Sequence, residues 1–229
     1  MKIISLTKRF GVKKVLSEIN MTIEKGKIYG LVGNNGAGKT TLLRCICGLL
    51  KFNSGEIIFD GDGKKTHIGA LIETPGLFKD MTAFDNLMLK AKIIGYKQSE
   101  QEILELLAFA GLGDVGKKKV GKFSMGMKQR LGIAMALIGN PEVILLDEPT
   151  NSLDPQGIME VRKLISKISA ERGITIMVSS HMLDELAKYA TDFFIMKKGK
   201  IIKEMTVEEL LSQSANSSID EYYLSIVNK

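Results

Sequence analysis

Apolar runs alternate with amphipathic stretches along most of the chain. The run at residues 27–32 becomes continuously apolar and ends in a glycine-rich turn, and a helical pattern follows from Lys39 to about residue 49. Further short apolar runs occur at 143–146, 174–178 and 193–196. Strands buried on both faces form such continuous runs, and strands that alternate with helices favour a mainly parallel sheet covered on both sides. The pattern therefore predicts an α/β fold.

Several of the predicted helices carry start and stop signals. Capping boxes at residues 99–102 and 206–209 open two helices, and Gly111 ends the first of them. The Asp-Pro pair at 154–155 opens another helix, whose apolar residues share one face and which ends before Gly173. These signals set the expected boundaries of the helices.

The pattern changes twice along the chain. Residues 82–139 have a helical pattern, which predicts a helical insert within a strand-rich frame. Before it, two strand-like runs at 56–60 and 68–72 flank a turn at 61–63. Near the end, residues 212–218 resemble a weakly ordered connection.

The composition is that of an ordinary folded protein. Of the 229 residues, 45% are apolar and 25% are charged, close to the average of soluble domains, so a disordered chain is not expected. The net charge is +6, but the lysines are scattered and tryptophan is absent. Solvated lysines therefore explain the charge better than a nucleic-acid or lipid surface, and we expect no direct nucleic-acid partner.

Membrane, export and metal signals are missing from the sequence. The longest nearly uncharged stretch, 131–139, is far shorter than the roughly 20 residues that cross a bilayer, and the start lacks a signal-peptide pattern. Cys45 and Cys47 point to different faces of a helix and cannot pair, which favours a reducing cytoplasm. Only His67 and His181 are histidines, too few for a His/Cys metal cluster. We expect neither a membrane span nor a cleaved export signal.

A glycine-rich motif follows the first apolar strand and precedes a helix, in the context that a phosphate-binding loop requires. The motif G-x-x-x-x-G-K-[ST] and the residue after it are Gly33, Asn34, Asn35, Gly36, Ala37, Gly38, Lys39, Thr40 and Thr41. In such a loop, backbone N–H groups curl around phosphates, the helix N-terminus adds positive charge, Lys39 bridges phosphate oxygens and the Thr40 hydroxyl binds Mg²⁺. An accidental turn does not explain Gly, Lys and Thr together.

Two carboxylates end the apolar strand at 143–146. Asp147 stands at the carboxyl end, where it would hold Mg²⁺ directly or through water, and Glu148 would reach the attacking water. A lone strand that ends in Asp-Glu is more often a solvated strand end. Paired with the phosphate loop, it indicates phosphoryl chemistry.

With these two motifs and those that follow, the chain resembles the ATP-binding cassette (ABC) family over nearly its whole length. Phe10 matches the aromatic residue that stacks on adenine, with a core phenylalanine as the alternative. The segment 124–129 matches the family signature at the start of a helix, 151–154 matches the loop that crosses the dimer interface, and His181 matches the γ-phosphate-sensing histidine.

The resemblance implies the site residues and their roles. Ser124 and the Gly126 N–H would contact the γ-phosphate of a nucleotide held by another subunit, and Asp154 would belong to the nucleotide-binding set. One phosphate loop covers only one side of a γ-phosphate, so a second copy would supply the missing donors. The catalytic set would be Glu148, His181 and Lys39, with ATP and Mg²⁺ as cofactors.

The resemblance also implies the domain organisation. The whole chain, 1–229, would be a single ABC domain of the phosphate-loop NTPase class. A RecA-like core with an N-terminal antiparallel β part would span about 1–81 and 140–211, with a helical subdomain at about 82–139 and a short tail at 212–229.

Two departures from the family pattern stand out. Met125 and Met127 replace a glycine and a glutamine of the signature, and Met125 would be strained if its φ had to be positive. Packing at the head of the helix is the alternative role, which we favour for Met127. Glu73 stands where the family has a glutamine that senses Mg²⁺, so the metal set would be Thr40, Asp147 and Glu73. Glu73 and the signature resemble the bacitracin-resistance and lantibiotic-immunity subgroup.

The leading hypothesis is an ATPase that pairs with itself or a related cassette and drives separate transmembrane permease subunits from the cytoplasmic face of a bacterial-type membrane. By subgroup resemblance, the cargo would be an antimicrobial peptide or a similar hydrophobic compound. Residues 77–81 would face the membrane partner, with internal packing as an equal alternative.

The second hypothesis is a soluble ABC ATPase that acts on ribosomes or DNA, for which the lysine run 117–119 is the best support. A GTPase or small-molecule kinase lacks the signature segment and is remote.

Overall fold

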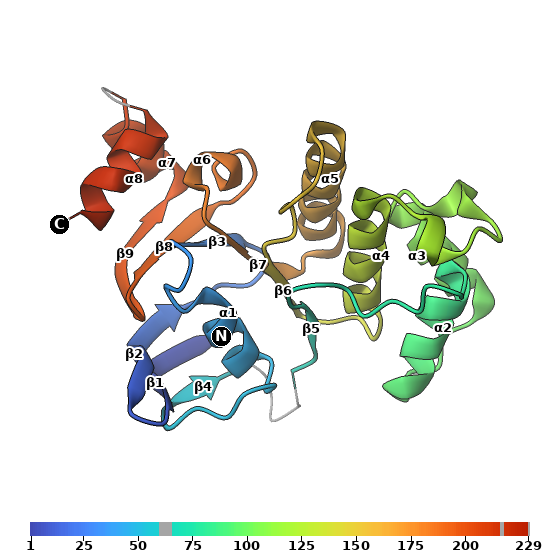
Figure 1. The fold of residues 1–229 in the computed structure, drawn as a ribbon, viewed down its shortest axis with the longest axis horizontal. Coiled ribbons are helices and arrows are strands. Elements are labelled where there is room, and N and C mark those ends of the chain that lie inside the picture. Colours follow the sequence, from blue (N-terminus) through green and yellow to red (C-terminus); the bar gives the residue numbers. More distant parts are fainter. Residues whose placement is uncertain (60–65, 216–217, 229) are drawn as a thin grey trace.

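The strands form two sheets in the computed structural model, which describes residues 1–59, 66–215 and 218–228 (Figure 1). The smaller sheet of this described part is antiparallel and has the order β2-β1-β4, with β1 at Lys2–Phe10, β2 at Lys13–Thr22 and β4 at Ser54–Ile58. The larger has the order β5-β6-β7-β3-β8-β9 and is parallel except for β9. Its strands are β3 Ile28–Val32, β5 Ile68–Leu71, β6 Val143–Asp147, β7 Thr175–Ser180, β8 Asp192–Lys197 and β9 Lys200–Thr206.

The helices gather in three places (Figure 1). Helix α1 contacts both sheets, α2 to α4 group beyond the β5 end with α5 beside α4, and α6 to α8 lie toward the β9 end. Their bounds are α1 Lys39–Ile46, α2 Ala83–Ile93, α3 Glu100–Phe109, α4 Met125–Leu137, α5 Pro155–Arg172, α6 Leu183–Leu186, α7 Val207–Gln213 and α8 Ile219–Val227. Short 3₁₀ turns at Gly113–Val115 and Val120–Lys122 link α3 to α4.

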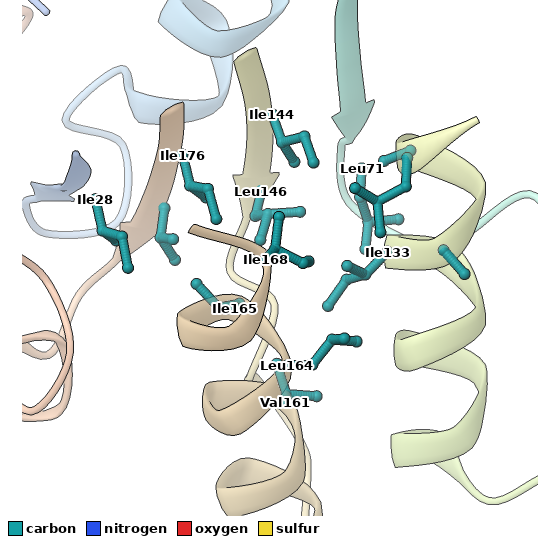
Figure 2. Packing of buried hydrophobic residues seen from close by; sticks show 14 of the residues in the cluster. Ile28, Leu71, Ile133, Ile144, Leu146, Val161, Leu164, Ile165, Ile168 and Ile176 are labelled. Atoms are coloured by element: carbon teal, nitrogen blue, oxygen red, sulfur yellow. The ribbon is translucent and has the colours of Figure 1, made fainter. Parts of the chain in front are cut away.

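The central strands β3, β6 and β7 are buried on both faces, which explains their continuous apolar runs. On β6, Ile144 and Leu146 belong to the core that includes α4 and α5, whereas Leu145 belongs to the core around α1 and the small sheet. Figure 2 shows Leu146 of β6 beside Ile168 of α5, with Ile144 farther along the strand. Alternate residues of one strand therefore contribute to two cores.

The fold class predicted from the sequence is confirmed: an α/β protein with a mainly parallel core sheet. Capping boxes open α3 and α7 at the predicted positions, and α5 begins after Asp154 and ends at Gly173, whose φ is +61°. The predicted turn at 61–63 lies outside the described residues. In the part of the chain that is described, no helix is both long and apolar enough to cross a membrane.

The C-terminal segment differs from the prediction. Helix α7 continues through Gln213, two residues into the stretch expected to be a loose connection, of which residues 216 and 217 lie outside the described part. Helix α8 then forms, although the sequence reading predicted no helix there. The sequence does contain a signal for the start of this helix. It is a capping box, in which the Ser218 side chain accepts a hydrogen bond from the Glu221 N–H.

Candidate functional site

The glycine-rich loop joins the end of β3 to the start of α1, as predicted. Gly36 and Gly38 have φ of +80° and +111°, which non-glycine residues rarely adopt. A Cβ on Gly33 would overlap the Met196 carbonyl oxygen, so only glycine fits against β8 there. An open cavity of about 520 Å³ lies over the loop. It is lined by the predicted residues Asn34, Asn35, Gly36, Ala37, Gly38, Lys39, Thr40 and Thr41, together with Glu148 and residues of β2.

Lys39 is almost fully buried at 6% exposure, yet its ammonium group lies at this cavity. Its Nζ donates a hydrogen bond of 2.6 Å to the Gly33 carbonyl oxygen and lies 3.2 Å from Glu148 Oε1. The loop thus folds back on its own lysine, and the lysine also contacts a predicted catalytic carboxylate. A cation held in this way next to backbone N–H groups is suited to bind phosphate oxygens.

The two carboxylates at the end of β6 point to different partners. Asp147, which is 3% exposed, accepts hydrogen bonds from Thr40 Oγ1 at 2.8 Å and from Ser179 Oγ at 2.6 Å. Glu148 follows with a φ of +47°, and its Oε2 accepts a hydrogen bond from His181 Nδ1 at 3.0 Å. The structure therefore brings two predicted metal residues, Thr40 and Asp147, into contact, and likewise two predicted catalytic residues, Glu148 and His181.

Ser179 belongs to this site and was missed by the sequence reading. It is fully buried, lies opposite Asp147 in the parallel pairing of β6 and β7, and its Oγ also accepts from the Glu148 N–H at 3.0 Å. One hydroxyl therefore contacts both the Asp147 carboxylate and the Glu148 backbone. The signal that could have found it is its position one residue beyond the predicted strand 174–178, because parallel strands end at the same edge of a sheet.

The oxygen atoms at this edge suit Mg²⁺, which needs few protein ligands, better than a metal that requires a full set of protein side chains. Among the described residues, no group of three or more His, Cys, Asp or Glu side chains has the geometry of a metal site. The Thr40 hydroxyl and the Asp147 carboxylate are hard oxygen donors in mutual contact. Mg²⁺ typically uses one or two such protein ligands and completes its octahedron with waters and substrate phosphates.

Glu73 lies near the same edge but bonds elsewhere. It lines a cavity of about 650 Å³ together with Thr40, Asp147 and Glu148. Its backbone φ is +63°, and its exposed carboxylate accepts a 2.6 Å hydrogen bond from Arg44 Nη2. The structure thus places Glu73 beside the predicted metal residues, with its charge paired to an arginine of α1.

Ser124, Gly126 and Asp154 lie at the starts of α4 and α5. The Ser124 hydroxyl accepts from the Met127 N–H at 3.2 Å, and Asp154 Oδ1 accepts from the Gly157 N–H at 2.7 Å. The three residues line one cavity of about 470 Å³. This cavity shares no lining residue with the one over the phosphate loop, while the lining of a third cavity, of about 650 Å³, includes Thr40 and Glu148 as well as Met125 and Ser152.

The two signature methionines are accommodated without backbone strain. Met125 is the first residue of α4 and is absent from the set of non-glycine residues with positive φ, so the strain that a positive φ would bring does not arise. Its side chain is 55% exposed. Met127 packs against the core, which agrees with the packing role favoured for it.

Phe10 is not a core residue, so that alternative is wrong. Its ring is 49% exposed at the end of β1, with Lys8 Nζ 4.7 Å from the ring centre. Phe10 does not line the phosphate-loop cavity, but its cross-strand neighbour Lys13 does. An exposed ring next to the cavity remains available for stacking.

Comparisons with known proteins agree with this geometry. A family model described as ABC transporter matches residues 16–151. The bacitracin transport ATP-binding protein BcrA of Bacillus licheniformis is 44% identical, over 100% of this chain and 76% of its own length. The lantibiotic transport ATP-binding protein SrtF of Streptococcus pyogenes is 45% identical, over 96% of this chain and 97% of its own length.

Solved structures extend the similarity to the fold. The ADP conformation of MJ1267, an ATP-binding cassette of an ABC transporter, superposes with a TM-score of 0.84 and 26% identity, over 97% of each chain. The cassette MJ0796, solved as a dimer in a post-hydrolysis state with ADP and Pi, gives a TM-score of 0.77 and 28% identity, over 90% of this chain and 98% of its own length.

Proposed function

Because this chain belongs to the ABC transporter ATP-binding family, we propose that it binds ATP with Mg²⁺ at the phosphate loop and pairs with a second cassette around it. As a family member it is an ATPase and the nucleotide-binding subunit of an ABC transporter. The observation that carries the proposal is the pair of contacts at the loop, Lys39 with Glu148 and Thr40 with Asp147.

In the proposed reaction, water attacks the γ-phosphate in line with the leaving group. Glu148 positions the water and accepts its proton, and His181, held by Glu148 at 3.0 Å, orients the phosphate. Lys39 and the loop N–H groups stabilise the charge that develops on the phosphate oxygens. Mg²⁺, held by Thr40 and Asp147, would neutralise further phosphate charge when bound, and Glu73 would tune its affinity.

The proposed partner for nucleotide binding is a second copy or a related cassette. Ser124 and Gly126 line a cavity that shares no residue with the cavity over the loop of their own chain, which supports a γ-phosphate contact made to another subunit. The relative MJ0796, solved as a dimer with ADP and Pi, is a precedent for pairing in this fold. ATP would then join the two subunits, and hydrolysis would release them.

A groove between α2, β5 and α4 is the proposed dock for a membrane subunit. Its cavity of about 300 Å³ is lined by the exposed apolar residues Phe78, Ile93 and Ile94. Leu77, in contrast, packs against the core. Within the predicted docking segment 77–81, Leu77 therefore packs internally and Phe78 is available to a partner. The protein would then sit on the cytoplasmic face of the membrane.

The proposed cargo is an antimicrobial peptide or a similar hydrophobic compound, exported for self-protection. The support is the resemblance in Glu73 and the signature, together with relatives named for bacitracin and lantibiotic transport. The proposal includes the division into a core with its antiparallel β part, about 1–81 and 140–211, and a helical subdomain, about 82–139. In its support, α2, α3 and α4 all fall between residues 83 and 137.

Two substitutions test the nucleotide site. Glu148→Gln should keep ATP affinity, nearly abolish turnover, and yield a dimer in ATP on size-exclusion chromatography. Lys39→Ala should instead lose ATP affinity, because the buried ammonium group that contacts the loop is removed. A Glu148→Gln variant that remains monomeric at saturating ATP would refute the shared site.

The membrane dock has its own test. Lys79→Glu, in the proposed docking segment, should reduce recovery of membrane proteins with the affinity-purified chain from native cells. Lys163→Glu, an exposed site on α5, is the matched charge reversal and should leave recovery unchanged. Equal recovery of membrane proteins with both variants would show that residues 77–81 do not form the docking site.

A further inference from the structure

The C-terminal helix α8 contacts the phosphate loop from the far end of the chain. The Tyr223 hydroxyl donates a hydrogen bond of 3.3 Å to Asn34 Oδ1, across 189 positions of sequence. The Tyr223 ring is 7% exposed and belongs to the same core as Leu183, Leu186 and Val227. Burial raises the pKa of the Tyr223 phenol, so the group remains a hydrogen-bond donor at physiological pH. The buried Tyr223 ring thus places its hydroxyl group at the phosphate loop.

Asn34 is the second residue of the phosphate loop and lies at its cavity. Its backbone oxygen accepts from the Ala37 N–H at 3.0 Å, and its side-chain oxygen is used by Tyr223. Within the described ranges, the Asn34 amide nitrogen makes no hydrogen bond with the protein. An amide held by its oxygen in this way has its two N–H donors left for a ligand, and phosphate oxygens accept but do not donate.

Helix α8 also supports the other side of the site. It packs against α6 and α7, and α6 begins two residues after His181 (Figure 1). The same helix therefore contacts the loop that would bind phosphates and the helix that follows the histidine bonded to Glu148.

We propose that Tyr223 is a positioning residue for the nucleotide: its hydroxyl holds the Asn34 side chain at the phosphate loop, so that an amide N–H donor is in place for a phosphate oxygen. The inference rests on the proposed nucleotide site at the loop. Without the hydroxyl, the Asn34 side chain loses its hydrogen-bond partner, and ordering it against a phosphate then costs conformational freedom. Affinity for ATP then falls although no atom that touches ATP has changed.

Tyr223→Phe tests this by removing one oxygen and keeping the packed ring. Loss of one neutral hydrogen bond should raise the Kd for ATP, measured by equilibrium binding of a fluorescent ATP analogue to the full chain, by about three- to tenfold. The KM for ATP should rise in parallel with little change in kcat. Tyr222→Phe is the matched control, because that hydroxyl bonds Gln213 and not the loop. It should leave the Kd unchanged.

A second pair of variants separates positioning from general destabilisation. In an Asn34→Ala background, Tyr223→Phe should have no further effect on the Kd, whereas a merely structural tyrosine would weaken binding equally in both backgrounds. Asn34→Asp, which retains an acceptor for Tyr223 but offers no N–H donor, should weaken ATP binding at least as much as Tyr223→Phe.

The outcomes distinguish the two proposals. Wild-type affinity in Tyr223→Phe, or equal effects with and without Asn34, would overturn the positioning role and leave the nucleotide site intact. Wild-type affinity in Asn34→Asp would do the same. Failure of the unmodified chain to bind the ATP analogue would instead overturn the proposed function.

Discussion

Ser179→Ala should be one of the most damaging single-atom changes at the site. The hydroxyl is fully buried, donates to Asp147 Oδ1 at 2.6 Å and accepts from the Glu148 N–H at 3.0 Å. The substitution removes the oxygen and leaves the backbone unchanged. It therefore isolates what this hydroxyl contributes to the Asp147 carboxylate and to the Glu148 backbone N–H.

The magnitude follows from which groups lose their partners. Asp147 Oδ1 is left without its donor in a side chain that is 3% exposed, and a buried hydrogen bond to a charged group contributes about 1.5–3 kcal/mol. The Glu148 N–H keeps the Ser179 carbonyl oxygen at 3.2 Å, so its loss is small. We expect the free energy of unfolding to fall by about 2–3 kcal/mol.

Urea denaturation followed by circular dichroism measures this change, since the chain has no tryptophan. Ser180→Ala is the matched control: its hydroxyl only accepts from the Met182 N–H at 3.0 Å, so it should cost about 0.5–1.5 kcal/mol. Turnover of ATP by Ser179→Ala should also fall by about tenfold or more, as for other residues that orient metal ligands. Equal stability of the two variants would refute the reasoning.

Three further predictions concern packing, Glu73 and the thiols. Gly69→Ala should lower the free energy of unfolding by about 2 kcal/mol or more, because its methyl would overlap a carbonyl oxygen of α4, whereas Gly76→Ala, in open space, should change it by less than about 0.5 kcal/mol in the same urea assay. Glu73→Gln should cost less than about 1 kcal/mol, since it breaks an exposed ion pair, yet shift the Mg²⁺ dependence of ATP hydrolysis or coupling to membrane subunits; no change in either would refute its tuning role. Burial raises the pKa of both thiols, so iodoacetamide should label both slowly at pH 7.5, and half-buried Cys47 before Cys45, by mass spectrometry.

The elements that could be predicted from the sequence are those specified by neighbouring residues. The phosphate loop, the end of β6 at Asp147 and the start of α5 at Asp154 each depend on a local pattern, such as a glycine pair, an apolar run or a capping side chain. The Thr40–Asp147 contact agrees with the prediction that both residues hold Mg²⁺, which came from the phosphate-loop motif and from the apolar strand that ends at Asp147.

The remaining contacts depend on how distant segments meet. Ser179 faces Asp147 only through the register of β6 and β7, and the Arg44–Glu73 pair joins α1 to the segment after β5. Tyr223 reaches Asn34 only because α8 folds back over α6. No local pattern specifies such pairs, since each residue alone is compatible with an ordinary surface or core position.

The contact between Lys39 and Glu148 has a consequence for timing. An ammonium group has three hydrogens, and here one goes to the Gly33 carbonyl oxygen while the carboxylate lies 3.2 Å away. A phosphate that arrives at Lys39 competes with an anion that the protein itself provides, so entry of the substrate is an exchange of counter-ions. The displaced carboxylate is then free to turn to water. Binding of a triphosphate at Lys39 would thus release the Glu148 carboxylate, the proposed base, from its ion pair. Until then, the lysine would keep that carboxylate neutralised.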